Sequence, residues 1–289
     1  MHSKVEIQED KTADEKKPHI VRKVGQDNKI KNVIAVMSGK GGVGKSFVTS
    51  LLATALVQEE FRVGILDADI TGPSIPSFFG LHGPVYSEEK KLIPLQSRLG
   101  IKIMSMNLLL PSTDQAIIWR GPMISKAINQ LWEDVLWGGL DYLLIDLPPG
   151  TSDAAITIMK SLPLNGILMV TSPQSLSSMI VRKAINMSQH MGIKVTGVIE
   201  NMSYFVCPIC NTHHSIFGIS HAGEVAKAAD TSILVRLPIS PDVAELCDQG
   251  KIEDFVSVEI KNALEQLIPQ KDSFNSYKSK KGDSFKKKG

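Results

Sequence analysis

The sequence has few cysteines, few aromatic residues and no long apolar run. Only 3 of its 289 residues are cysteine and 6% are aromatic. Three cysteines cannot build the disulfide framework of a small secreted domain, and residues 1–19 are charged throughout, unlike a secretory signal. No apolar segment approaches the ~20 residues that a membrane-spanning helix needs. We therefore expect a cytoplasmic protein with reduced thiols and an aliphatic core.

The sequence also lacks a large excess of either charge, because it has 32 basic and 30 acidic side chains and a net charge of +2. The distribution is uneven, since residues 271–289 hold seven lysines and two aspartates. A basic tail can contact nucleic acid or anionic lipid, but this one lacks an amphipathic period. We expect a solubilising tail and neither a nucleic-acid nor a membrane partner. The predicted organisation is a flexible arm (1–30), one folded domain (31–269) and a flexible tail (270–289).

Short apolar segments alternate with helical patterns through the predicted domain. The strand candidates are 32–38, 62–67, 141–146, 166–171, 194–199 and 233–237. The helix candidates are 47–59, 122–137, 152–161, 176–191, 221–229 and 254–268. Segments 91–96 and 101–106 are expected to form an additional hairpin. Apolar strands separated by helices indicate an α/β fold with a doubly wound, mostly parallel sheet covered on both faces.

A glycine-rich segment joins the first predicted strand to the first predicted helix. It matches the pattern G-x4-G-K-[ST] of a phosphate-binding P-loop in the expected strand–loop–helix context. Its backbone N–H groups and the helix N-terminus suit the phosphates of ATP. Lys45 is expected to neutralise the β- and γ-phosphates, and the Ser46 hydroxyl to bind Mg²⁺. The predicted nucleotide-binding residues of the loop are Gly39, Lys40, Gly41, Gly42, Val43, Gly44, Lys45 and Ser46.

Aspartates end two further strands. Asp67 and Asp69 are two residues apart, so in extended backbone they point the same way. One can hold water in a Mg²⁺ shell while the other orients the water that attacks ATP. Asp146 ends an apolar strand and is followed by Pro-Pro-Gly, as expected for the metal-binding aspartate of a P-loop protein and a switch loop. A single aspartate at a strand end is more often a helix cap. Here Asp146 is the third element of an ordered set, after the phosphate loop and the Asp67–Asp69 pair, which favours the metal-binding role.

The segment 39–46 resembles the deviant phosphate loop of the P-loop NTPase family that includes MinD, ParA and nitrogenase iron protein. The resemblance implies a homodimeric ATPase in which Lys40 is catalytic and reaches the partner's nucleotide, as an arginine finger does. It assigns Asp69 to the attacking water and Asp67 to the Mg²⁺ shell. It also implies that Asn201 and Pro238 contact adenine, although an asparagine after a strand is commonly a turn residue.

Cys207 and Cys210 form a C-x2-C pair with three chemical interpretations: half of a zinc site, a redox dithiol, or half of an iron–sulfur site. The dithiol ranks last, because the pair lies late in a P-loop domain. His213 and His214 are near in the sequence, but adjacent histidines rarely both reach one tetrahedral ion. We expect them to be solvated, and Cys247 to be a packing residue. One chain then supplies two thiolates, and two chains supply four. Four thiolates suit a [4Fe–4S] cluster or zinc.

Over residues 30 to 268 the chain resembles the Mrp/ApbC iron–sulfur cluster carriers. The segments that carry the resemblance are 39–46, 67–76, 146–153 and 200–203, followed by C-P-x-C. It implies an ATPase that holds a [4Fe–4S] cluster between two copies on Cys207 and Cys210. It also implies transfer to apo-proteins and contact with cluster assembly scaffolds. Two alternatives remain at this stage: a MinD/ParA-like positioning ATPase, and a nucleotide-gated scaffold with negligible hydrolysis.

Overall fold

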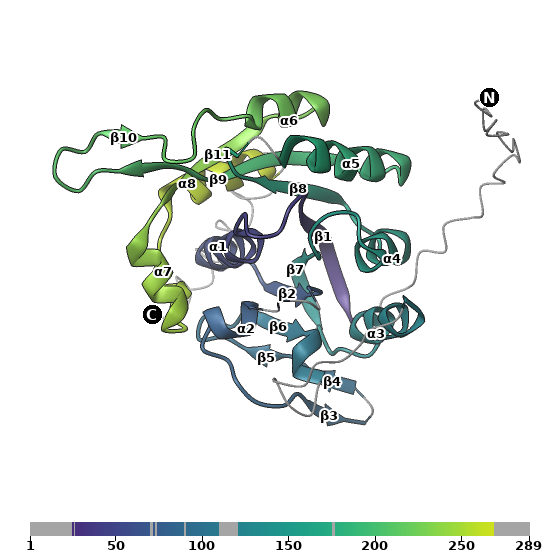
Figure 1. Cartoon of the computed structure of the whole chain (residues 1–289). Helices are drawn as coiled ribbons and strands as arrows, with labels where there is room; N and C mark the ends of the chain where they lie inside the picture. The colour runs from purple at the N-terminus through teal and green to yellow at the C-terminus, as the bar shows by residue number, and fades with distance from the viewer. Residues whose placement is uncertain are drawn as a thin grey trace, which may run out of the picture.

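A mostly parallel sheet forms the centre of the computed structural model, which describes residues 25, 27–69, 72, 74–89, 91–109, 121–174 and 177–268. The strand order is β10-β9-β8-β1-β7-β2-β6-β5, and β11 lies beside β9 (Figure 1). Only β5 with β6 and β9 with β10 pair antiparallel in this described sheet. The strands are β1 (Lys29–Ser38), β2 (Val63–Asp67), β5 (Leu95–Gln96), β6 (Lys102–Ser105), β7 (Gly139–Asp146), β8 (Gly166–Thr171), β9 (Val195–Val206), β10 (His213–His214) and β11 (Ile233–Ile239).

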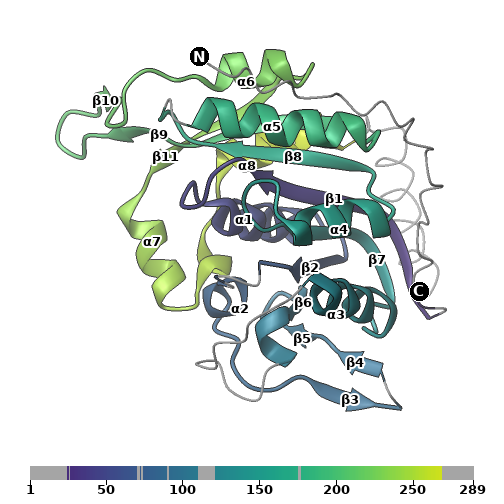
Figure 2. The same ribbon diagram turned by 45° about the vertical axis from the view of Figure 1, so that its right-hand side comes forward.

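Helices cover both faces of this sheet, as the two views in Figures 1 and 2 show. One apolar core lies under α3 (Gly121–Glu133), α4 (Asp153–Ser161), α5 (Ser177–His190) and α6 (Ala222–Ala228). The other lies under α1 (Lys45–Gln58), α2 (Ile75–Phe78), α7 (Pro241–Asp248) and α8 (Val258–Leu267). Residues of β1 alternate between them, because Val33, Ala35 and Met37 join the first core and Val36 the second. The predicted doubly wound α/β fold is confirmed.

Several element boundaries differ from those predicted. Strand β1 begins at Lys29, because its backbone already pairs there with Gly139 of β7. Helix α8 begins at Val258, where the Ser257 hydroxyl accepts the Ile260 N–H at 3.2 Å, and a 3₁₀ turn (Ile252–Asp254) precedes it. Helix α3 ends at Glu133, although the apolar pattern continues to Trp137, which is buried after the helix. An apolar pattern indicates which residues are buried, and buried residues can follow the last hydrogen bond of a helix. The pattern therefore does not fix where the helix ends.

The predicted hairpin is partly wrong. Its second half is observed, since Leu95 and Gln96 pair with Ile103 and Lys102. The first half instead forms β4 (Lys91–Ile93), which pairs with β3 (Tyr86–Glu88) in a separate two-stranded sheet. The segments 86–88 and 101–106 both lie close to 91–96 along the chain, so the local sequence did not show which of them pairs with residues 91–93.

Parts of the predictions fall outside the described residues. These are the tail 270–289, most of the arm 1–30, and residues 70, 71, 73 and 176 of the predicted motif and helix. Within the described chain, none of the helices has the length and apolar character that crossing a bilayer requires.

Candidate functional site

The phosphate loop runs from the end of β1 to the first turn of α1. Gly42 and Gly44 both have φ of +79°, a left-handed conformation that glycine adopts at little cost. A Cβ at Gly39 would lie 2.6 Å from the backbone nitrogen of Val181, so the loop also packs directly against α5. The loop therefore lies against α5 and leads directly into α1. The first N–H groups of α1 have no acceptor within the helix, and they make its N-terminus a suitable site for an anion.

Lys45 and Asp146 form the buried centre of the site. The Lys45 ammonium is 5% exposed and lies 2.7 Å from Oδ2 of Asp146, whose side chain is fully buried. The Ser46 hydroxyl donates to the same oxygen at 2.5 Å, and the Thr49 hydroxyl donates to Oδ1 at 2.8 Å. Burial raises the pKa of Asp146, and the Lys45 charge and these hydrogen bonds oppose that rise. The sequence motif identified three of these residues but gave no signal for Thr49.

Asp67 lies directly beside Asp146, since the two residues are register partners of β2 and β7. Ser105 of β6 donates to its Oδ2 at 3.2 Å, and the backbone N–H of Asp69 donates to Oδ1 at 3.2 Å. Burial, followed by the Asp146 charge, raises the pKa of Asp67 to about 8, against the opposing charge of Lys45. Two buried carboxylates beside a serine hydroxyl are the hard oxygen donors that Mg²⁺ prefers. The side chains therefore fit the metal shell that the sequence predicted.

The two predicted catalytic residues lie in different surroundings. Asp69 is buried, and its Oδ2 lies 3.8 Å from the Lys45 ammonium, at the edge of the carboxylate cluster. Lys40 instead donates from Nζ to Oε1 of Gln174, 3.2 Å away in the segment after β8. Sequence reasoning did not identify Gln174. The action of Lys40 across a dimer stays a prediction.

The predicted switch loop, residues 148–153, lies against the phosphate loop. The Gly150 N–H donates to the Ser38 carbonyl at 2.8 Å, and Gly150 has φ of +73°. A Cβ at Gly41 would lie 3.9 Å from Pro149 Cγ, which is ordinary van der Waals contact. Ser152 then caps α4, accepting the Ala155 N–H at 3.3 Å. The segment therefore contacts the phosphate loop directly, and its role as a switch stays a prediction.

Asn201 is not a turn residue, and this alternative is wrong. It lies inside β9, is 3% exposed, and donates from Nδ2 to the Val43 carbonyl of the phosphate loop at 3.0 Å. Pro238 does not follow its strand either, because β11 extends to Ile239 and Pro238 pairs with Tyr204 of β9. Asn201 therefore borders the nucleotide loop directly, whereas Pro238 lies farther along the same pair of strands.

Cys207 and Cys210 occupy the tip of a hairpin that β9 and β10 extend beyond the body of the molecule (Figures 1 and 2). The Cys207 N–H donates to the Thr212 carbonyl at 3.0 Å, and the Asn211 N–H donates to the Cys207 carbonyl at 2.9 Å. Cys210 is exposed and Cys207 is half-buried. Hydrogen bonding to Thr212, and then to Cys207, lowers the pKa of Cys210, so its thiolate forms more readily.

Exposed isoleucines lie at both ends of the segment that returns from this tip, Ile209 beside Cys210 and Ile219 near α6. Ile209 is 93% exposed and Ile219 is 85% exposed. Both histidines are exposed, as predicted, but the His213 ring also stacks on Tyr204, with centroids 4.6 Å apart. Among the described residues, no group of three or more His, Cys, Asp or Glu side chains is arranged to hold a metal. The cysteine pair is therefore a two-ligand group in this part of the chain.

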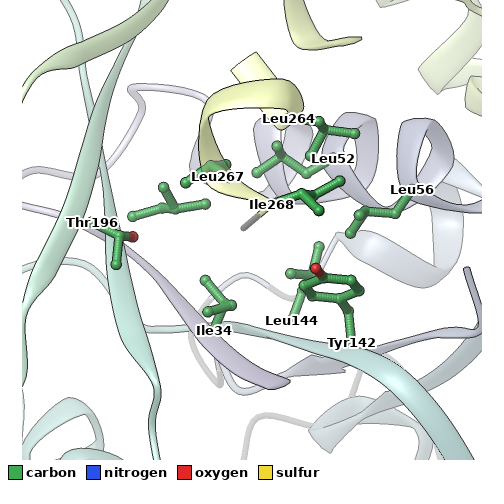
Figure 3. Close-up of a pocket in the computed structure, with 10 residues that line it drawn as sticks. Ile34, Leu52, Leu56, Tyr142, Leu144, Thr196, Leu264, Leu267 and Ile268 are labelled. Atoms are coloured by element: carbon green, nitrogen blue, oxygen red, sulfur yellow. The ribbon is translucent and has the colours of Figure 1, made fainter. Parts of the chain in front are cut away.

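An apolar pocket lies between α1, α8 and the sheet, and its lining includes neither the residues of the phosphate-loop site nor the cysteine pair (Figure 3). Tyr142 and Thr196 supply its polar atoms, and no charged side chain lines it. A triphosphate therefore has no partner there. The lining residues are Ile34, Leu52, Leu56, Tyr142, Leu144, Leu168, Thr196, Leu264, Leu267 and Ile268.

Comparison with known proteins agrees with this geometry. The family described as ParA, NUBPL iron-transfer P-loop NTPase, matches residues 29–270. The chain belongs to this family. It is 45% identical over 247 residues to an iron-sulfur cluster carrier protein of Clostridium perfringens, covering 83% of this chain and 86% of the relative. It is 45% identical over 233 residues to the cytosolic Fe-S cluster assembly factor Nubp2 homolog of Drosophila willistoni, covering 76% and 86%.

Solved structures with this fold include one at 43% identity and others at 21% or less. A nucleotide-binding protein from Archaeoglobus fulgidus in complex with ADP superposes with a TM-score of 0.72 at 43% identity, covering 80% of this chain and 91% of that chain. The MinC:MinD cell division complex of Aquifex aeolicus superposes with a TM-score of 0.59 at 21% identity, covering 83% and 98%. The second likeness concerns the fold alone. The predicted resemblance to the iron–sulfur carriers and to MinD and ParA is confirmed.

Proposed function

We propose that this chain is an ATP-hydrolysing iron–sulfur cluster carrier. One observation supports it most: the strand that borders the phosphate loop through Asn201 continues into the hairpin that carries Cys207 and Cys210. Thiols on a projecting hairpin can receive and release a cargo, whereas a buried pair cannot. Relatives at 45% identity bear the name of cluster carriers or assembly factors, and a MinD-like positioning role would leave the cysteine pair without a purpose.

The cargo in this proposal is a [4Fe–4S] cluster bound by four thiolates, two from each of two copies. Cys207 and Cys210 are the ligands, and Cys247 is not, because it is buried in α7. Assembly scaffolds supply the cluster and apo-proteins receive it. A cytoplasmic location, where thiols remain reduced, accompanies this activity.

The nucleotide site supplies the hydrolysis. Lys45 and the loop N–H groups bind the phosphates, and Asp69 orients a water and takes its proton. That water attacks the γ-phosphorus as the bond to the β-phosphate oxygen breaks, leaving ADP and phosphate. Ser46, Asp67 and Asp146 would hold Mg²⁺, which neutralises charge on the phosphates when bound. Lys40 adds a further cation from the opposite copy. Contacts between the two copies couple ATP hydrolysis at the phosphate loop to cluster transfer at the cysteine pair.

Anaerobic reconstitution tests the proposal. Iron, sulfide and native mass are measured for the parent, for Cys207→Ala and Cys210→Ala, and for Cys247→Ala as the matched control. We expect one [4Fe–4S] cluster per dimer in the parent and in the control, and its loss with retained ATP binding in the other two variants. Zinc without sulfide, or a full cluster on a monomer, would contradict the proposal.

A further inference from the structure

The segment 201–220, which we call the cysteine excursion, begins within β9 and ends just before α6. Its two ends are joined by one side chain. The Glu200 carboxylate is fully buried and accepts hydrogen bonds from the hydroxyls of Ser203 and Ser220, each at 2.6 Å. Because Ser220 lies at the far end of the excursion, its bond to Glu200 closes the base.

A third donor completes this group. Arg236 of β11 donates from Nε to Glu200 Oε2 at 3.2 Å, although the Arg236 side chain itself is 51% exposed. A buried carboxylate without donors is strongly unfavourable, and here three donors from three segments satisfy it. Glu200 therefore fixes the beginning of the excursion, its end and the neighbouring strand in one arrangement.

The next residue along β9 contacts the nucleotide loop. Asn201 donates to the Val43 carbonyl at 3.0 Å, and a Cβ at Gly44 would lie only 2.2 Å from Asn201 Nδ2. No space separates loop and strand at this point. Consecutive side chains of a strand point to opposite faces, so a single peptide unit connects the phosphate loop on one face with the base of the excursion on the other.

We propose that Glu200 is a positioning residue that sets the geometry of the two thiols and, with Asn201, transmits nucleotide binding to them. When phosphates bind the N–H groups of the loop, the Val43 carbonyl shifts with that backbone. Asn201 follows its acceptor, and Glu200 carries the movement to Ser220 and the excursion. This inference rests on the proposed function for the use of the thiols, but its test needs only the metal-free protein.

Two serine variants give a matched test. Ser220→Ala and Ser203→Ala each remove one 2.6 Å hydrogen bond to the same carboxylate, but only Ser220 closes the base. The readouts are amide exchange of the segment 207–212, where the N–H groups of Cys207 and Asn211 are bonded, and the alkylation rate of Cys210 by iodoacetamide with and without saturating Mg²⁺–ADP. Nucleotide affinity and the unfolding midpoint are measured in parallel.

In Ser220→Ala we expect exchange at 207–212 to be on the order of tenfold faster, the factor that loss of one charge-assisted hydrogen bond represents. We also expect the ADP-dependent change in Cys210 alkylation, present in the parent, to be lost while ADP affinity is retained. Ser203→Ala should keep both properties of the parent. Glu200→Gln retains the shape of the side chain but loses its charge, and it should behave like Ser220→Ala. It provides the same test if Ser220→Ala folds poorly.

Equal behaviour of the two serine variants would overturn the assignment of Ser220 and Glu200 as the base closure. An alkylation rate that ignores ADP in the parent would overturn transmission. Neither result depends on a cluster, so failure of the inference is distinguishable from failure of the carrier proposal, which reconstitution decides.

Discussion

At the scale of single residues, two lysines of one loop lie in different surroundings. Lys45 is buried against Asp146, whereas Lys40 is half-buried against Gln174. We expect Lys45→Ala to lower ATP affinity by at least about 100-fold, near the upper range for a charge-assisted hydrogen bond. Lys40→Ala is the matched control and should bind ATP as the parent does but hydrolyse it slowly. Calorimetric titration measures the ATP affinity of both variants, and an unchanged affinity in Lys45→Ala would contradict the assignment of the phosphate loop.

Two of the three thiols, those of Cys210 and Cys247, are expected to differ in reactivity. Burial, and then the charge of Asp248, raises the pKa of Cys247 to about 11, whereas hydrogen bonding lowers that of Cys210. With a pKa of about 11, roughly one Cys247 in 3,000 is a thiolate at pH 7.5, and only the thiolate reacts. Brief anaerobic alkylation followed by mass spectrometry should label Cys210 first and leave Cys247 intact. Labelling of Cys247 at the rate of Cys210 would contradict this order.

The sequence patterns correctly placed the residues that they singled out, whereas the roles of these residues stay predictions. The loop 39–46 joins β1 to α1, and the aspartates at positions 67, 69 and 146 lie together at the ends of neighbouring strands. Ser105 and Gln174 were not foreseen, because strand register and packing bring them to the site from other segments. Thr49 lies in α1 only three residues after Ser46, but it falls outside the loop pattern. A lone serine or threonine carries no signal of its own in a sequence.

At the scale of elements, one carboxylate of β7 forms ion pairs with a residue of β1 and with the residue that precedes β2. Asp141 of β7 contacts the Arg62 side chain at 3.1 Å and the Lys31 ammonium at 2.8 Å. Burial alone would raise the pKa of Asp141, but hydrogen bonds from Arg62 and Lys31 outweigh it and hold that pKa below its usual range. The folded state therefore gains stability above the unfolded pKa of about 4 and loses it as pH falls.

Asp141→Asn tests this ion pair. Because Lys31 and Arg62 are 66% and 61% exposed, we expect a loss of only about 1 kcal/mol in the free energy of unfolding at pH 7. The difference from the parent should shrink as the pH is lowered below about 4. Urea unfolding at a series of pH values measures it, and a difference that stays constant with pH would refute the electrostatic origin.

Element prediction worked for apolar strands and failed for polar ones. The strand predicted to end at Ile199 continues to Val206 through Glu200, Asn201 and Ser203. The polar side chains concealed it, and Met202 has a left-handed φ of +55° that interrupts regular alternation. What extends the strand is backbone pairing with β11 and β10, which depends on segments distant in the sequence.

At the scale of the whole molecule, action of Lys40 across a dimer makes a prediction about mixtures. Lys40→Ala and Asp69→Ala should each suppress ATP hydrolysis in a homodimer. In a mixed dimer the two lesions can fall in one site, which leaves the other site complete if Lys40 serves the partner's nucleotide. We expect hydrolysis to return on mixing. Mixed dimers that form, by native mass spectrometry, yet remain inactive would exclude action in trans.

The length of β9 has a geometric consequence for such an assembly. From Asn201 to Cys207 the strand behaves as a lever of about 20 Å, at roughly 3.3 Å per residue. A rotation of about one degree at its root then displaces the tip by about 0.35 Å. For the proposed cluster shared by two copies, a tilt of this size beside the phosphate loop would change the distances between the sulfur atoms that the two copies supply.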